Sequence, residues 1–235
     1  MSEINRPAPT NLRLAAALIG GTALLEVVLV THHPVVSRVE HDSGLAFDAL
    51  AAIVQANLAF HAVLMLVAVG QLAGLFLFAR RLGLDRPLVL TGSLLCSLAT
   101  MLIVTAMTFD GFVVYELVSR CSMSAGGCSA DVTGALQLVS AIIQGFTKLG
   151  FGAQCIGFAA LGLASWSLGG KARIGSVLSV MAATAPLAIL TSGSYVGPEQ
   201  LTQILGLLGG WGLCMAIILV AATLPSAGRS FGDNA

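Results

Sequence analysis

Charged residues are scarce in this sequence of 235 residues. Asp, Glu, Lys and Arg make up 9% of the chain and aromatic residues 6%, with only two tryptophans and two tyrosines. Soluble domains carry about 25% charged residues, so this chain has too few charges to cover its surface in water. The eleven basic and eleven acidic residues cancel. Charge therefore gives no basis for a nucleic-acid partner.

Apolar residues are abundant instead. They account for 57% of the chain, the mean hydropathy is +0.93, and 27 residues are glycine. A stretch of about 20 apolar residues is long enough to cross the ~30 Å hydrocarbon core of a bilayer. The sequence contains six such stretches, at about residues 12–31, 47–79, 88–108, 132–167, 174–192 and 201–224. We therefore predict an all-α, polytopic membrane bundle of six transmembrane helices in contact with lipid.

The basic residues predict how this bundle is oriented, because cytoplasmic loops retain Lys and Arg. Only Arg38 and Arg120 fall in the predicted outer loops. Residues 1–11 and 225–235 are accordingly predicted to be cytoplasmic tails, and loops 1, 3 and 5 to lie on the periplasmic side of an inner membrane. The basic residues on the predicted cytoplasmic side are Arg6, Arg13, Arg80, Arg81, Arg86, Lys171, Arg173 and Arg229.

The third loop, residues 110–131, is predicted to be long and to lie on the outer side. It contains Cys121 and Cys128 in the sequence CSMSAGGC. An oxidising compartment would let these two thiols pair, so we expect a disulfide across the glycine turn. Cys96, Cys155 and Cys214 fall inside predicted spans and are expected to be small core residues.

The second and fourth stretches are too long for one upright crossing, so these helices must tilt or project beyond the outer leaflet. They also share a short motif, AIVQ ending at Gln55 and AIIQ ending at Gln144. Each motif lies a similar distance before a basic residue, Arg80 or Lys171. This recurrence suggests three helical hairpins in parallel repetition.

Four ionisable residues fall at membrane depth, where charge is costly and usually functional. At ~1.5 Å per residue from the cytoplasmic ends, His33, His61 and Lys148 lie about 27 to 28 Å up, near the outer boundary. Glu26 lies about 10 Å deeper, two turns from His33 on the same face. Three helices thus bring nitrogen bases to one level, with a carboxylate beneath them.

Neighbouring polar residues extend these faces. Asn57 precedes His61 by one helical turn, and Gln144 precedes Lys148 by the same interval. Such faces should point inward, away from lipid. We therefore predict a polar, outward-facing cavity between the first, second and fourth spans.

A non-functional interpretation stays open for each of these residues. His61 and Lys148 could lie in the headgroup region, where Lys148 would extend toward water. Glu26 could be neutral and bonded to a hydroxyl group. Ser93, Ser97 and Thr100 lie on roughly one face of the third span and are the candidates for that bond.

Two function classes follow from these features. The first is a pathway for a small solute, an ion or protons that uses Glu26, with a helix kink at Pro186 in the fifth span. The second is a non-catalytic accessory or assembly subunit that packs against other membrane subunits or a second copy of itself. Its small-residue faces would be the two GxxxG patterns, Gly70 with Gly74 and Gly206 with Gly210.

A third class is a redox protein that binds a metal ion or haem. His33 and His61 would then be the imidazole ligands, with Glu26 beside them. No HxxxH or CxxCH spacing supports this hypothesis. The P-loop, HExxH and GxGxxG motifs of common enzyme classes do not occur either, so the sequence favours a non-enzymatic function.

Overall fold

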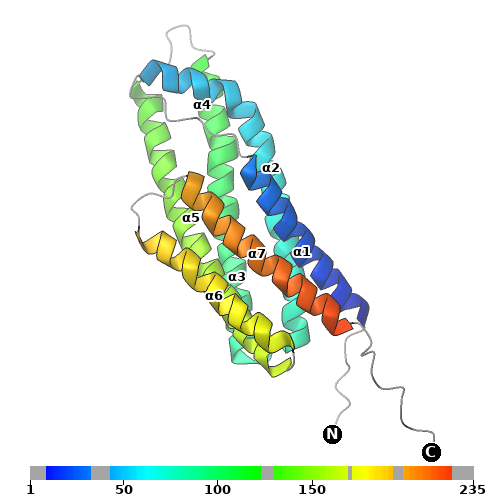
Figure 1. The fold of residues 1–235 in the computed structure, drawn as a ribbon. Helices are drawn as coiled ribbons and strands as arrows, with labels where there is room; N and C mark the ends of the chain where they lie inside the picture. Colours follow the sequence, from blue (N-terminus) through cyan, green and yellow to red (C-terminus); the bar gives the residue numbers. More distant parts are fainter. Residues whose placement is uncertain (1–8, 33–42, 123–129, 169–170, 193–197, 224–235) are drawn as a thin grey trace, which may run out of the picture.

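The fold is known from a computed structural model that describes residues 9–32, 43–122, 130–168, 171–192 and 198–223. Within these ranges the chain is helical apart from short turns, and no strand occurs, which confirms the all-α prediction. Figure 1 shows the elements, and their bounds are α1 Pro9–Thr31, α2 Ser43–Leu82, α3 Pro87–Thr108, the π-helical η1 Phe109–Val113, α4 Val114–Ser122, α5 Ala130–Ser165, the 3₁₀ turn η2 Trp166–Leu168, α6 Lys171–Ser192 and α7 Pro198–Thr223.

The turn between α2 and α3 shows how the sequence ends one helix and begins the next. Gly83 has a φ of 96°, a left-handed conformation that any residue with a Cβ adopts at a cost. Its N–H donates to the Ala79 carbonyl at 3.0 Å, as at a glycine C-cap. Pro87 then occupies the first turn of α3, where its missing N–H costs no hydrogen bond.

The six long helical segments form a closed ring. Each packs on the next along the chain in the order α1, α2, α3, α5, α6, α7, and α7 returns to pack along α1. The beginning of α1 and the end of α7 lie at the same end of the molecule (Figure 1). We call this the basic end, because described arginines lie at or beside the helix ends there: Arg13, Arg80, Arg81, Arg86 and Arg173.

Glycines bring the helices of the ring into close contact. A Cβ at Gly74 would lie 2.9 Å from Ile19 of α1, and a Cβ at Gly70 would lie 3.1 Å from Thr22 of the same helix. Both glycines of the first predicted GxxxG pattern therefore lie against a neighbouring helix. A Cβ at Gly157 would come within 3.0 Å of the Gly92 carbonyl oxygen, where α5 meets α3.

The second predicted GxxxG pattern does not make such a contact. In the part of the chain that the structure describes, nothing lies within 4 Å of a Cβ built at Gly206 or Gly210. The glycines of α7 that face α1 are instead Gly209 and Gly212, where a built Cβ would lie 2.5 Å from Val27 and 2.7 Å from Ala23, respectively. The face of α7 that packs on α1 is therefore that of Gly209 and Gly212, and a contact of Gly206 and Gly210 with another subunit or a second copy stays a prediction.

The prediction of a third loop at residues 110–131 is wrong for residues 110–122. Residues 109–122 continue α3 through η1 and α4, so one helical segment runs from Pro87 to Ser122. The charged residues that resembled a loop lie on its surface, where Arg120 pairs with Glu116 at 2.8 Å, whereas Val114 and Val118 are buried. This alternation is the pattern of an amphipathic helix.

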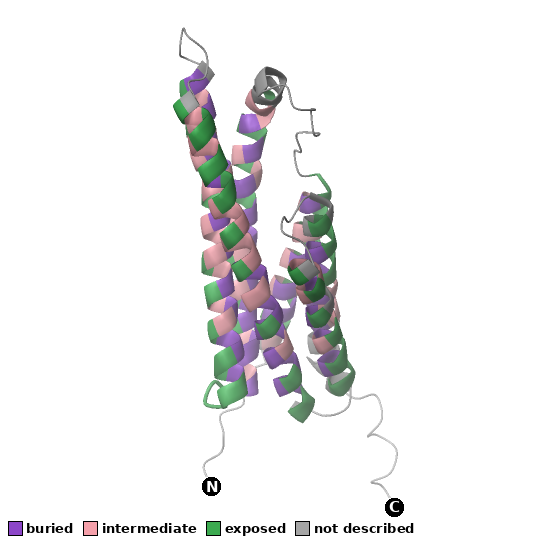
Figure 2. Cartoon of the chain, turned by 90° about the vertical axis from the view of Figure 1, so that its left-hand side faces the viewer, coloured by how far each residue is buried: buried purple, intermediate pink, exposed green. Residues whose placement is uncertain are grey.

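The long helices α2 and α5, and the continuous segment of α3, η1 and α4, project beyond the other helices of the ring (Figure 2). α2 has 40 residues and α5 has 36, whereas α1, α6 and α7 have 23, 22 and 26. We call residues 43–60, 109–122 and 130–146 the three-helix extension. It has a small core of its own around four buried valines, Val54, Val114, Val118 and Val139.

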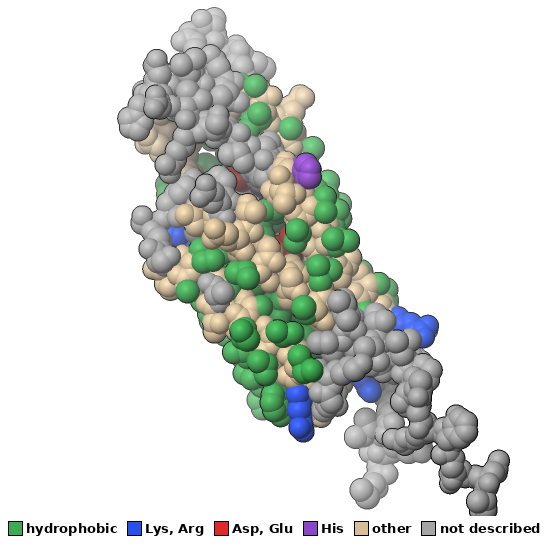
Figure 3. All heavy atoms as spheres, in the orientation of Figure 1, with side chains coloured by type: hydrophobic (Ala, Val, Ile, Leu, Met, Phe, Trp, Pro, Cys, Tyr) green, Lys and Arg blue, Asp and Glu red, His purple; other side chains and the backbone are tan. Residues whose placement is uncertain are grey.

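Large apolar side chains are exposed around the ring. They include Leu66 at 74%, Met101 at 68% and Leu149 at 65% exposure. Figure 3 shows such side chains over the visible helices, with most of the basic groups near the basic end. Among the described residues, five helical segments are long and apolar enough to cross a membrane: Leu12–Thr31, Leu50–Leu82, Pro87–Cys121, Asp131–Ser165 and Arg173–Thr191. The fold is therefore compatible with a multi-pass membrane protein.

Pro186 lies fully buried inside α6, which continues to Ser192. Because proline has no N–H, the Ala182 carbonyl lacks its usual intrahelical donor there. The predicted kink therefore falls at a buried proline in the interior of α6, and the kink itself stays a prediction.

Candidate functional site

Polar side chains interrupt the buried stripe of α2 at two levels. Asn57, His61 and Gln71 are each 5% exposed, whereas Leu64 and Val67, between the two levels on the same helix, are apolar and similarly buried. His61 and Gln71 are ten residues apart, so the two levels are separated by ~15 Å along the helix. Each level has its own set of partners.

The first set, which we call the central polar chain, crosses the ring from α1 to α5. Gln71 Nε2 donates to Glu26 Oε2 at 3.3 Å, and Gln154 Nε2 donates to Gln71 Oε1 at 3.2 Å. Both glutamines are buried, and Glu26 is half-buried. From the basic end these residues lie ~14 to 20 Å along their helices, about half the thickness of a bilayer core.

The central polar chain leaves one acceptor unpaired. Gln154 Oε1 is buried and has no hydrogen-bond partner in the described part of the chain. A proton on Glu26 would reverse the direction of this chain and leave the amide nitrogen of Gln154, in place of its oxygen, without a partner. The carboxylic acid would donate to Gln71 Oε1, and both amides would turn so that Gln71 Nε2 donates to Gln154 Oε1. Three residues therefore have two hydrogen-bonding arrangements that differ by one proton on Glu26.

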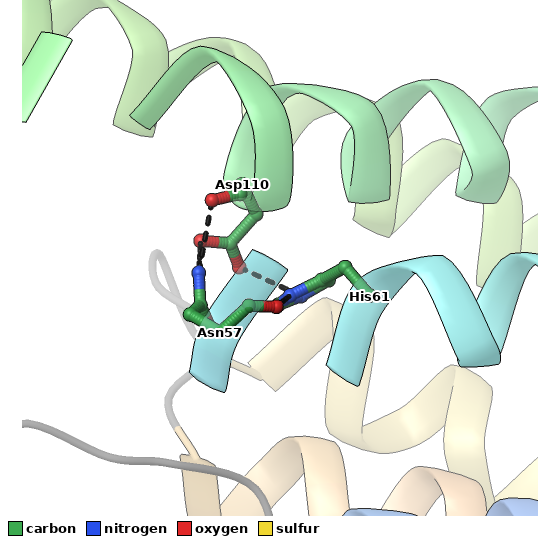
Figure 4. A network of polar contacts seen from close by, with 3 residues as sticks. All are labelled: Asn57, His61 and Asp110. Carbon is green, nitrogen blue, oxygen red and sulfur yellow. Dashed lines mark hydrogen bonds and ion pairs between the residues drawn. The ribbon is translucent and has the colours of Figure 1, made fainter. Parts of the chain in front are cut away.

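The second set, which we call the outer polar cluster, joins α2 to η1 (Figure 4). His61 Nε2 lies 3.2 Å from Asp110 Oδ2, and His61 Nδ1 lies 2.8 Å from the Asn57 carbonyl oxygen. Asn57 Nδ2 donates to the Asp110 carbonyl at 2.9 Å. The imidazole is therefore held between its own helix and a carboxylate of the next one.

The π-helical turn η1 supplies Asp110 to this cluster. A π turn widens the helix by one residue and changes which side chains face a neighbour. Gly111 then allows η1 to lie directly on α2, since a Cβ there would be 2.8 Å from the Cβ of His61. The local sequence FDGFV thus places the carboxylate next to a residue that has no Cβ to obstruct the contact.

The structure does not bring the predicted site residues together as one group. Glu26 binds Gln71 and His61 binds Asp110, on different levels of the bundle. Gln144 and Lys148 are half-buried on α5. His33 lies outside the described residues, so its predicted position beside His61 stays a prediction.

The hydroxyl groups that we considered as partners of Glu26 have other partners. Ser93, Ser97 and Thr100 each donate to the carbonyl one turn back in α3, at 2.8, 2.9 and 2.9 Å. The partner of Glu26 is the amide of Gln71 instead. The alternative of a hydroxyl partner from the third span is therefore not realised in the structure.

The sequence did not indicate Gln154 as a site residue, and it did not indicate that Asp110 contacts His61. Gln154 is an amide at a similar distance from the basic end to that of Gln71, and that similarity was the available signal. Asp110 was counted as an outer-loop residue because the helix was expected to end at Thr108. Recognising that Val114 and Val118 continue the apolar stripe would have kept Asp110 on the helix.

The described residues test the predicted metal ligands and the predicted roles of the cysteines only in part. Among the described residues, no group of three His, Cys, Asp or Glu side chains is arranged to hold a metal ion. Cys96, Cys155 and Cys214 are free thiols, as core cysteines would be. Cys121 is buried at the end of α4, and Cys128 lies outside the described residues, so their disulfide stays a prediction.

Comparison of the chain with protein-family models, with curated proteins and with solved structures finds no significant match.

Proposed function

We propose that this chain is a six-span membrane protein that moves protons, with Glu26 as the carrier at the centre of the bilayer. Both ends of the chain would lie on the cytoplasmic side, and lipid would cover the exposed apolar side chains of the ring. The gathering of arginines at the basic end supports this orientation, because Lys and Arg are retained on the cytoplasmic side.

The central polar chain is the observation that carries the proposal. A carboxyl group halfway across a bilayer is expensive, and such groups mark proton relays and ion pathways. Here Glu26 is held by Gln71 and, through it, by Gln154 of a third helix. Both amides can turn over, so Gln71 keeps a hydrogen bond to each neighbour whether Glu26 is ionised or protonated, which suits a group that exchanges a proton.

The packing on either side of this chain supports access from the outer side. Phe158 is one turn nearer the basic end than Gln154 and stacks on Trp211 of α7, with ring centroids 3.8 Å apart. Both aromatic side chains are buried, so the packing on this side of Gln154 is apolar. On the other side the outer polar cluster lies only ~15 Å away, with Leu64 and Val67 of α2 between the two levels.

Proton flux into vesicles tests the proposal. The purified protein is reconstituted into liposomes that contain a pH-sensitive dye, and a pH gradient or a potassium diffusion potential is applied. We expect flux with the natural protein and a loss of at least about tenfold with Glu26→Gln, which keeps the shape of the side chain and removes its titration.

Glu116→Gln is the matched control, because Glu116 is an exposed carboxylate in the three-helix extension. We expect it to leave flux unchanged. Equal flux with Glu26→Gln and the natural protein would overturn the proposal. Absence of flux from both, together with a stoichiometric membrane partner in mild detergent, would favour an accessory subunit instead.

A further inference from the structure

The outer polar cluster fixes the protons of His61. A backbone carbonyl oxygen only accepts hydrogen bonds, so the 2.8 Å contact between His61 Nδ1 and the Asn57 carbonyl requires a hydrogen on Nδ1. That contact alone selects the Nδ1–H form of a neutral imidazole. Nε2 would then present a lone pair in the direction of Asp110.

The contact on the other side of the ring requires one more proton. Asp110 Oδ2 lies 3.2 Å from His61 Nε2. An ionised carboxylate also accepts only, so two lone pairs would face each other unless a proton lies between them. A hydrogen on Nε2 that donates to Oδ2 removes this conflict and makes the ring an imidazolium.

We infer that His61 and Asp110 form a binding site for one proton at the outer end of the ring. The inference rests on the proposed function and deepens it, because the site would load the protons that reach Glu26. Proton binding converts neutral His61 and anionic Asp110 into an imidazolium–carboxylate pair. Proton release returns both groups to their former charge, so no other reactant is needed.

The burial of the pair sets the route of exchange. The side chain of His61 is 6% exposed, whereas that of Asp110 is 35% exposed. The edge of Phe60 packs near the imidazole, with ring centroids 5.5 Å apart. Protons therefore arrive through Asp110, on the side of the pair that is open to solvent.

Other titratable groups near the level of His61 have partners other than His61. Glu116 and Arg120 are exposed and pair with each other, and Glu26 binds Gln71 deeper in the ring. Asp110 is the carboxylate in contact with the imidazole. The titratable side chains described around His61 at its level and on either side are Glu26 of α1, His32 directly after α1, Asp110 of η1, Tyr115, Glu116 and Arg120 of α4, and Asp131 and Lys148 of α5.

Nitrogen NMR of the full-length protein, labelled at the histidine rings and held in lipid nanodiscs, tests the site. His61→Gln identifies the signals of His61 among those of the four histidines. In the natural protein at neutral pH we expect both ring nitrogens of His61 to be protonated. In Asp110→Asn we expect a neutral ring with hydrogen on Nδ1 only, because the amide introduced by this substitution can donate to Nε2.

A neutral His61 in the natural protein, or an Nε2–H tautomer in either protein, would overturn the site. Gly111→Ala is a second variant, which retains both His61 and Asp110 but displaces η1 and with it Asp110, since the new Cβ would meet His61. We expect it to shift His61 toward the neutral form. Gly145→Ala is its matched control, because nothing lies within 4 Å of that Cβ. Equal spectra for the two variants would also contradict the site.

The outcome is separable from that of the proposed function. The predicted His61 spectra without any dependence of flux on Glu26 would overturn the proposed function alone. A Glu26-dependent flux together with an Nε2–H tautomer at His61 would overturn the outer site alone.

Discussion

The six-helix ring and the three-helix extension share three of their helical segments but differ in surface. In the ring, exposed positions hold large apolar side chains such as Leu98, Met101 and Leu163. In the extension, exposed positions hold polar residues such as Gln55 and Asp131, with few large apolar ones. The buried sides are alike, since both have apolar cores. A change of solvent from lipid to water along each helix, as the proposed function requires, would produce this difference in surface.

The polar clusters follow the same division. The central polar chain lies inside the ring, ~14 to 20 Å from the basic end. The outer polar cluster lies where the extension begins. Asp110 at that junction is partly exposed, and Gln154 inside the ring is 6% exposed. A proton that enters from the outer side would thus reach the partly exposed Asp110 before the buried central polar chain.

The largest expected effect is a loss of stability when arginine replaces an exposed apolar residue of the ring, compared with the same change in the three-helix extension. Met101 of α3 is 68% exposed in the ring, and Leu138 of α5 is 63% exposed in the extension. We expect Met101→Arg to destabilise the membrane-inserted protein by about 2.5 to 3.5 kcal/mol, because arginine near the bilayer centre costs about that much. We expect Leu138→Arg to cost less than about 0.5 kcal/mol. Reversible unfolding in bicelles measures both, and similar costs at the two positions would remove the distinction between the regions.

Helix packing within the ring gives the second effect. Gly157→Leu would force a side chain against Cys96 and the Gly92 carbonyl, whereas nothing lies within 4 Å of a Cβ at Gly152. We expect Gly157→Leu to lower the free energy of unfolding by about 1 to 3 kcal/mol through overpacking. Gly152→Leu, on the same helix, should change it by less than about 0.5 kcal/mol. Thermal unfolding in detergent provides the measurement, and a stable Gly157→Leu protein would contradict the close α3–α5 contact.

The smallest effect concerns the extension surface. Arg120 and Glu116 pair at 2.8 Å one helical turn apart, and both are more than half exposed. In water such a pair contributes only ~0.3 to 0.5 kcal/mol, and salt screens it. We expect Glu116→Ala to reduce stability by no more than that, with the difference vanishing in high salt. A loss that is larger and insensitive to salt would indicate that the extension lies in lipid.

The helices were predictable from the sequence because their boundaries have local causes. Pro87 begins α3, Gly83 ends the helix before it, and the apolar stretches carry few charges. The excessive lengths of the second and fourth stretches also correctly anticipated continuous helices, α2 and α5. These features depend only on neighbouring residues, which a sequence states directly.

The site was only partly predictable because its partners come from distant parts of the chain. Glu26, Asn57 and His61 attracted attention as polar residues at depth, but Gln154 and Asp110 gained their roles from residues 83 and 49 positions away. The π-helical turn could not be foreseen, since Asp110 and Gly111 also suit a loop. Likewise Gly206 and Gly210 matched a motif, although other glycines of α7 face α1.

Lipid exposure along α5 tests the central claim most directly, because this one helix runs through both regions. Spin labels are placed at four exposed positions, Leu138, Leu149, Ile156 and Leu163, and their collisions with oxygen and with a water-soluble nickel complex are compared in reconstituted vesicles. We predict that oxygen dominates at Leu149 and Ile156 and that the nickel complex dominates at Leu138. A nickel-dominated signal at Ile156, or an oxygen-dominated signal at Leu138 equal to that at Ile156, would contradict a ring in lipid with its extension in water.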